Sequence, residues 1–219
     1  IITLLALTFQ NFLALILAVI IDRGIKFEKF FRTVYFIPPI LSGVVVGLVW
    51  KWIYDGNYGI LNTILSYIGL EKCATSWLSN SKTALLSVAI VHMWKGFGWG
   101  FVILLAGLQT IPRELYEAAS IDGADSFKQF CYVTVPLMIP IFFIVSILTI
   151  LGTMQIFDLI YSMTRGGPAG ATEVPITYIY RYMANNELGY ATAMAVIFGI
   201  VLFLLSIFQI KISRKLKKV

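Results

Sequence analysis

Long apolar runs constrain the fold of this 219-residue chain more than any other feature of its sequence. Each run is close to the roughly 20 residues that a helix needs to cross the apolar part of a bilayer. The composition agrees, because 59% of the residues are hydrophobic and 13% are charged, whereas soluble domains carry about 25% charged residues. We therefore predict an all-α, polytopic membrane protein. Its five predicted spans are residues 1–21, 33–54, 83–108, 136–161 and 189–210.

The basic residues predict which side of the membrane each connecting segment faces. Four of them lie in residues 22–32, and five lie in the last nine positions. Because Lys and Arg gather in cytoplasmic loops, we place both clusters in the cytoplasm, and the alternation of spans adds residues 109–135 to that side. The net charge of +6 then reflects topology and contact with membrane lipid, and we expect no nucleic-acid partner. The clustered residues are Arg23, Lys26, Lys29, Arg32, Lys211, Arg214, Lys215, Lys217 and Lys218.

Several local features refine the predicted spans. Pro38 and Pro39 stand in the first turns of the second run and predict a kink there. Gly43 and Gly47 form a small-xxx-small pair that would let a neighbouring helix approach closely. Residues 60–70 are too short to span, so we expect a helix that lies on the outer surface or dips partly into the membrane. The first run has few polar interruptions, which are Thr3, Thr8, Gln10 and Asn11.

Residues 109–135 form a polar segment between the third and fourth runs. Thr110 is placed to cap a helix, with Pro112 in its first turn. Ala118 and Ala119 lie on one small, flat face of that helix, which suits close packing by another protein. Gly123 provides a C-terminal stop.

A second helix is predicted after this stop. Asp125 is placed to cap it, and it would continue into the fourth run at Pro136. The segment holds Arg113 and Lys128 against four carboxylates, so it is acidic on a side of the membrane where its neighbours are basic. This sign favours a basic partner surface rather than lipid.

The segment resembles the EAA loop of ABC importer permeases, EAA-x3-G-x9-I-x-L-P. Here the pattern is Glu117-Ala118-Ala119, then Gly123, then Val133-Thr134-Val135-Pro136, with valine at both the Ile and the Leu position. The resemblance extends over residues 12–214 and is greatest to the carbohydrate-uptake permeases, the maltose and multiple-sugar type. The stretches that carry it are FFRTVYFIPPILS, GLVWKWIYDGNYGILN, WLSNSKTALLSVAIVHMWKG, LAGLQTIPRELYEAASIDGA and the GGP after the fourth run.

The resemblance implies one type I ABC importer transmembrane domain over residues 1–219, with a cytoplasmic coupling loop at residues 109–135. Family members carry one further span before the first run, so six are expected in the full chain. The first helix of the loop would be a coupling helix that sits in a cleft of an ATPase subunit, where Glu117 would meet basic groups. The implied ATPase-coupling residues are Glu114, Glu117, Ala118, Ala119, Asp122 and Gly123.

The resemblance also implies the partners. They are a second, related permease, two cytoplasmic ATPase subunits and an external solute-binding protein, in the plasma or inner membrane of the cell. ATP and Mg²⁺ would be bound by the ATPase subunits. This chain lacks a Gly-rich phosphate-binding loop followed by Lys-Ser/Thr, so we expect it to bind no cofactor.

No set of side chains in the sequence suggests catalysis. One histidine, His92, and two separated cysteines, Cys73 and Cys131, make no zinc site. The predicted topology places the cysteines on opposite sides, so no disulfide is expected between them. No nucleophile, base and orienting group stand together, and we predict a transport subunit rather than an enzyme.

Polar side chains inside the spans are the candidates for contact with a solute, because such groups are costly in a membrane unless they serve a function. No motif singles out individual contacts, and packing between helices or snorkelling is the more common reason for a polar residue at such a position. Lys95 and Asp158 can also pair with other chains. The candidates are His92, Lys95 and Trp99 in the third run, and Thr153, Gln155 and Asp158 in the fourth.

The function that the resemblance implies is ATP-driven import of a sugar or oligosaccharide by alternating access. One alternative is an importer of the same class for another solute, such as glycerol phosphate, although a phosphate would favour more arginine than the spans contain. A second is a secondary transporter or channel, which would need inverted repeats or ion-coupling acids in broken helices. A third is a structural membrane subunit without a solute path.

Overall fold

The computed structural model describes residues 1–22, 24 and 26–216, with side chains as far as residue 212. Within this range every regular element is a helix, which confirms the all-α prediction. The predictions made for Arg23, Lys217 and Lys218 fall outside the described residues. Four of the described helices are long and apolar enough to cross a membrane, and a bent pair of helices makes a possible fifth span.

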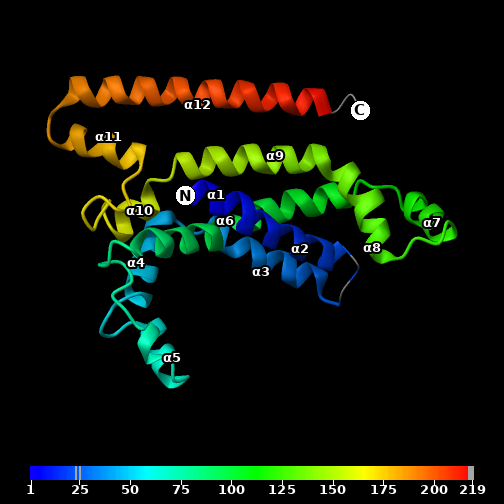
Figure 1. The fold of residues 1–219 in the computed structure, drawn as a ribbon, viewed down its shortest axis with the longest axis horizontal. Coiled ribbons are helices and arrows are strands. Elements are labelled where there is room, and N and C mark those ends of the chain that lie inside the picture. The colour runs from blue at the N-terminus through cyan, green and yellow to red at the C-terminus, as the bar shows by residue number, and fades with distance from the viewer. Residues whose placement is uncertain (23, 25, 217–219) are drawn as a thin grey trace.

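The first and third predicted spans are confirmed. The first comprises α1 (Ile2–Leu5), the π-helical turn η1 (Ala6–Gln10) and α2 (Asn11–Asp22), which together form a 21-residue helix. The third is α6 (Ala84–Leu108), a helix of 25 residues. These two helices pack side by side in the centre of the molecule (Figure 1).

The second predicted span is not one kinked helix. It comprises α3 (Glu28–Ile40) and α4 (Gly43–Ile53), whose axes differ by 94°. The prediction of a kink in its first turns was wrong, because α3 begins among the charged residues and the two prolines lie in its last turn. Pro38 and Pro39 have no N–H to offer to the carbonyls four residues earlier, so the ladder weakens and the chain turns at Leu41 in an extended conformation.

The fourth predicted span begins earlier and ends earlier than expected. A continuous helix of 29 residues comprises α8 (Ser126–Gln129), the π-helical turn η3 (Phe130–Thr134) and α9 (Val135–Met154). The helix is interrupted after Met154, and α10 (Asp158–Met163) follows as a separate element. The predicted end at residue 161 was therefore wrong, while the prediction that the second helix of the EAA segment (residues 109–135) continues into the span is confirmed.

The remaining helices occupy the two ends of the bundle and one side of it. They are α5 (Ile60–Tyr67), the 3₁₀ turn η2 (Glu71–Cys73), α7 (Arg113–Ile121), α11 (Pro175–Ala184) and α12 (Leu188–Leu216). Helix α5 has eight residues and is too short to span, as predicted. Helix α12 confirms the fifth span and packs mainly on α9 and α11.

The segments predicted to share one side of the membrane lie at one end of the bundle (Figure 1). This end, called here the α7 end, holds α7 and the C-terminal ends of α2 and α12. The opposite end, called the α5 end, holds α5, α10 and α11. The arrangement matches the alternation of spans that the sequence predicts.

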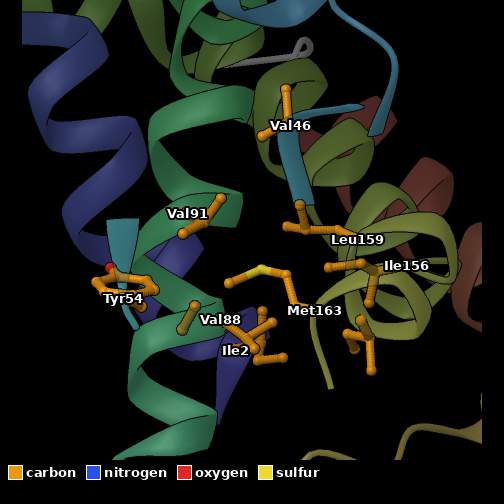
Figure 2. Packing of buried hydrophobic residues seen from close by; sticks show 10 residues of the cluster. Ile2, Val46, Tyr54, Val88, Val91, Ile156, Leu159 and Met163 are labelled. Atoms are coloured by element: carbon orange, nitrogen blue, oxygen red, sulfur yellow. The ribbon is translucent and has the colours of Figure 1, made fainter. Parts of the chain in front are cut away.

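Buried apolar side chains form two clusters along the bundle. The cluster nearer the α5 end brings together side chains of α1, α4, α6 and α10, among them Val46, Val91 and Met163 (Figure 2). The second cluster lies between α2, α6 and α9 and is centred on Phe101, Leu104 and Met138. Lipid tails are as apolar as these side chains, so the helices are held together in the bilayer by close van der Waals packing.

Glycines set the closest helix contacts. The predicted small-xxx-small pair packs α4 on α10, since an added Cβ at Gly43 would lie 3.0 Å from Asp158 Cβ and one at Gly47 would overlap the hydroxyl of Ser162. Gly98 of α6 likewise allows α3 to pack closely on α6. An added Cβ at Gly98 would overlap the Tyr35 carbonyl oxygen and lie 2.7 Å from Pro39 Cγ.

We predict that Gly98→Ala destabilises the protein, by about 1–3 kcal/mol as is common for overpacked sites. The obstructing group is backbone, which cannot rotate away as a flexible side chain could. Gly199→Ala is the matched control, because Gly199 lies in helix α12 and its added Cβ would meet nothing within 4 Å. The measurement is the midpoint of thermal unfolding in detergent, and equal midpoints for the two variants would contradict the assigned contact.

Candidate functional site

The EAA segment begins with a helix that stands away from the bundle (Figure 1). Pro112 occupies the N-cap position of α7, and no side chain caps the helix. The prediction that Thr110 caps it was wrong. The Thr110 hydroxyl donates instead to the Gly107 carbonyl at 2.7 Å, because the last turn of α6 leaves that carbonyl available.

Gly123 ends α7 in the way that the sequence predicts. Its φ is +79°, in the left-handed region that favours glycine. The Gly123 N–H donates to the Ser120 carbonyl at 3.1 Å and the Ala124 N–H donates to the Ala119 carbonyl at 2.9 Å. These two bonds are the Schellman arrangement that satisfies the free carbonyls of a helix end.

The second helix of the segment is capped and tied to the first. The Asp125 carboxylate accepts from the Lys128 N–H at 2.8 Å, which confirms the predicted N-cap. The Tyr116 and Thr134 hydroxyls lie 2.9 Å apart, and Gln129 donates to the Ser120 hydroxyl at 2.8 Å. The helix–turn–helix is therefore a preformed unit, joined without a break to α9.

The outer face of this unit is free of contacts with the rest of the chain. In α7, all of whose residues the structure describes, no side chain is buried. Sequence reasoning missed two large apolar side chains here, Ile121 and Phe127, which are 86% and 74% exposed. Their signal is the presence of large apolar residues in an otherwise polar loop. Of the predicted coupling residues, Glu114, Glu117, Ala118, Asp122 and Gly123 are exposed and Ala119 is partly buried.

A cavity of about 730 Å³ lies along the middle of α6, between that helix, α9 and the two helix interruptions. Its size is in the range of small-molecule sites. Of the residues predicted to contact a solute, His92, Lys95, Trp99, Gln155 and Asp158 line it. Sequence reasoning missed Gln10, Phe36 and Thr149, which line it as well.

Thr153 is the one predicted residue that does not line the cavity. It is 4% exposed, and its hydroxyl lies 3.0 Å from the Thr3 hydroxyl and 2.9 Å from the Ile150 carbonyl. The side chain therefore joins α9 to the first helix. In this case the packing interpretation explains the polar residue in the span.

The two charged groups of the cavity lie at the helix interruptions. The Lys95 ammonium donates to the Pro39 carbonyl at 3.2 Å, at the C-terminal end of α3. Asp158 is the first residue of α10. A cation at a helix C-terminus and an anion at an N-terminus each have the favourable sign for the helix dipole, so both charges stabilise the interruptions that border the cavity.

The aromatic and amide groups give the cavity its binding character. Trp99 packs edge-on against Phe36, with ring centroids 5.0 Å apart, and Trp99 is 54% exposed. Gln155 is exposed at the point where α9 ends. Aromatic faces combined with a few hydrogen-bonding groups are the usual lining of a site for a small polar ligand.

Comparison with known proteins gives a consistent result. A family model described as "Binding-protein-dependent transport system inner membrane component" matches residues 10–218. The chain is 38% identical to a probable ABC transporter permease protein, YurN of Bacillus subtilis, over 92% of this chain and 70% of that protein. It is 36% identical to the multiple sugar-binding transport system permease protein MsmF of Streptococcus mutans, over 98% and 73% of the two chains. It is 31% identical to the trehalose/maltose transport system permease protein MalF of Thermococcus litoralis, over 95% and 70%.

Solved structures share the fold. The chain superposes with a TM-score of 0.86 on a bacterial ABC transporter involved in the import of the acidic polysaccharide alginate, at 24% identity, over 98% of this chain and 76% of that chain. The TM-score is 0.88 for the alginate transporter in complex with an alginate pentasaccharide-bound periplasmic protein, at 24% identity, over 100% and 76%. The chain, from α1 to α12, thus has the fold of these solved chains.

Proposed function

The chain belongs to the family of binding-protein-dependent transport system inner membrane components, and from this membership we propose that it imports a sugar or oligosaccharide. As an ABC transporter permease it is a multi-pass membrane transport component, not an enzyme. Two relatives carry names that state sugar transport, MsmF and MalF.

The lining of the cavity carries the proposal of a sugar. A sugar ring offers an apolar face to an aromatic side chain and hydroxyls to amides, and the cavity provides both kinds of group. Trp99 and Phe36 offer the aromatic faces, and Gln155 offers an exposed amide. His92 and Asp158 would complete the contacts at the two ends of this set.

A phosphate-bearing solute fits the cavity less well. Among the described residues that line it, Lys95 is the single side chain with a fixed positive charge, and its ammonium already donates to the Pro39 carbonyl. Phosphate recognition favours arginine or several donors around one anion. A neutral sugar requires neither.

We propose that the outer face of the EAA segment couples ATP hydrolysis by the ATPase subunits to transport. Glu114, Glu117, Ala118, Ala119, Asp122 and Gly123 would dock into one of two cytoplasmic ATPase subunits, which bind the ATP and Mg²⁺. Helix α6 ends at Leu108, just before α7, and α9 continues the second helix of the segment. Both α6 and α9 line the cavity. A movement of the EAA segment would therefore be carried by these helices to the cavity, and would change the side of the membrane to which the cavity opens.

The exposed surfaces of this chain suggest where its other partners bind. Trp99 lines the cavity and is 54% exposed, so a second, related permease would close that side. The α7 end and the C-terminus would face the cytoplasm, in keeping with the basic clusters of the sequence. The α5 end would then face the external solute-binding protein on which the family depends.

The sugar assignment is tested on the cognate binding protein. We expect isothermal calorimetry to detect binding of maltose, trehalose or an arabino-oligosaccharide, with glycerol 3-phosphate as the comparison ligand. Micromolar or tighter binding of a sugar is typical of a specific small-ligand site. Binding of glycerol 3-phosphate alone would contradict the sugar assignment and leave the importer assignment in place.

Reversal of charge at Glu117 tests the coupling surface. Glu117 is exposed on a helix without buried side chains, so Glu117→Lys should leave folding and insertion intact. Against a basic docking cleft the new cation repels, and we expect the ATPase to be lost from the purified complex and ATP-driven uptake to fall at least tenfold, since like charges in contact cost several kcal/mol. Glu71→Lys, an exposed acid at the α5 end, is the control for ATPase co-purification. Retention of the ATPase by the Glu117 variant would count against the assignment.

Gly123 offers a sharper test, because a matched glycine exists at the other end of the bundle. Gly123 and Gly69 have φ values of +79° and +78°, and an added Cβ at either would meet nothing within 4 Å. Gly69 also ends its helix with the same pair of backbone bonds. The backbone strain of an alanine, roughly 1–2 kcal/mol, is therefore equal at both.

We predict that Gly123→Ala weakens association with the ATPase and that Gly69→Ala does not. The difference arises because a docked partner occupies the space beside Gly123, and Gly123→Asp should weaken association further. Co-purification and the affinity of the purified permease for its ATPase measure the effect. Equal affinities for the two alanine variants would remove Gly123 from the docking surface.

A further inference from the structure

Gln10 is a buried amide without a partner in the wall of the cavity. It is 6% exposed, it lines the cavity, and among the described residues its Oε1 accepts no hydrogen bond. Buried polar groups are nearly always paired, and an unpaired one calls for an explanation. Gln10 belongs neither to the EAA segment nor to the helices that the sequence singled out for solute contact.

The fold holds this amide in place by two local features. Gln10 is the last residue of the π-helical turn η1, where one extra residue shifts the side chains that follow around the helix axis. Opposite it, Gly96 of α6 leaves the space that the amide fills. An added Cβ at Gly96 would lie 2.8 Å from Gln10 Oε1 and 3.0 Å from Nε2.

Two other polar groups of the cavity wall make hydrogen bonds within the chain. The Thr149 hydroxyl lies 3.1 Å from Asn11 Oδ1 and 2.8 Å from the Val145 carbonyl. The Lys95 ammonium donates to the Pro39 carbonyl. Gln10 Oε1 is enclosed beside Gly96 and has no protein donor among the described residues, so the contents of the cavity that Gln10 lines are the remaining source of a partner for the amide.

We propose that Gln10 is a specificity-determining contact for the transported sugar. A carboxamide presents an acceptor and a donor side by side, which matches two neighbouring hydroxyls of a sugar ring. Rotation of the amide about its last side-chain bond would bring the enclosed oxygen to the cavity. The oxygen would then accept from one hydroxyl while the amide N–H donates to the oxygen of the next. This inference rests on the proposed sugar function and adds to it the residue that selects for a hydroxyl pair.

Cysteine accessibility tests the placement of the side chain. The chain has two free cysteines, Cys73 and Cys131, and replacement of both by serine gives a clean background. In that background Gln10→Cys should react with a small water-soluble methanethiosulfonate reagent in the reconstituted complex. Ala14→Cys is the control, because Ala14 lies on the next turn, is 0% exposed and packs near Gly100. Absence of reaction at position 10 would overturn the placement.

Uptake kinetics test the role. Gln10→Leu replaces the amide with an apolar group and leaves a side chain of similar size. With whichever of maltose, trehalose or an arabino-oligosaccharide the wild type transports, we expect the half-saturating concentration of uptake to rise about tenfold, with little change in the maximal rate. A monodeoxy analogue that lacks the partnered hydroxyl should be transported equally by wild type and variant. If Gln10→Leu weakens uptake of the parent sugar and of every monodeoxy analogue by the same factor relative to wild type, the role of Gln10 is purely structural and the proposal is overturned.

The failure of this inference and the failure of the proposed function give different results. If wild-type proteoliposomes transport a sugar and Gln10→Leu transports it with unchanged kinetics, the inference about Gln10 fails and the function stands. If wild-type proteoliposomes transport glycerol 3-phosphate and none of the three sugars, the proposed function fails, and the hydroxyl-pair assignment fails with it.

Discussion

Two of the helices in the bundle are interrupted, and each interruption leaves backbone N–H and C=O groups without their helical partners. The rest of the structure depends on how these groups are stabilised inside a membrane. Irregular backbone at membrane depth is tolerated only where protein covers it or where it borders a cavity. Both interruptions, at residues 41–42 and 155–157, border the same cavity. Lys95 donates to a carbonyl at the end of α3, and Asp158 stands at the start of α10. Lys95 thus satisfies a backbone group at one interruption, and Asp158 has the sign that favours a helix N-terminus at the other.

The same interruptions explain which parts of the fold the sequence could predict. Uniform apolar runs and polar loops are properties of whole segments, so the presence of the long apolar helices and of the helix–turn–helix at residues 109–135 was predictable. The corner after α3 was misplaced because the helix begins at Glu28, inside the basic stretch that was assigned to a connecting segment. The end of α9 was missed because the run continues through an apolar sequence, with only Gln155 and Asp158 as signals. Whether a polar residue in such a run breaks the helix depends on a tertiary contact, here the packing of α10 on Gly43 and Gly47.

Individual site residues were less predictable than the segments that carry them. Thr153 and Thr149 are one turn apart on α9, yet the first binds Thr3 outside the cavity and the second lies in its wall. Gln10 looked like a minor polar interruption of the first run, and its position in the cavity depends on a π-helical turn that no sequence pattern announces. A helical wheel with 3.6 residues per turn places side chains incorrectly after such a turn, because the extra residue rotates everything beyond it.

The surroundings of the glycines differ between the cavity and the EAA segment. Gly43, Gly47, Gly96 and Gly98 are all held by contacts with this chain, since an added Cβ would collide with a neighbour. Their small size is explained by the packing of the bundle and by the room left for Gln10. Gly123 meets nothing, and its left-handed backbone is needed to turn the chain between two helices. Because the EAA segment is capped and hydrogen-bonded internally, its outer face is rigid before any partner arrives. A rigid, uncovered face joined directly to the helices that line the cavity is what a transmitter of force requires, since a flexible connection would absorb the movement before it reached the solute.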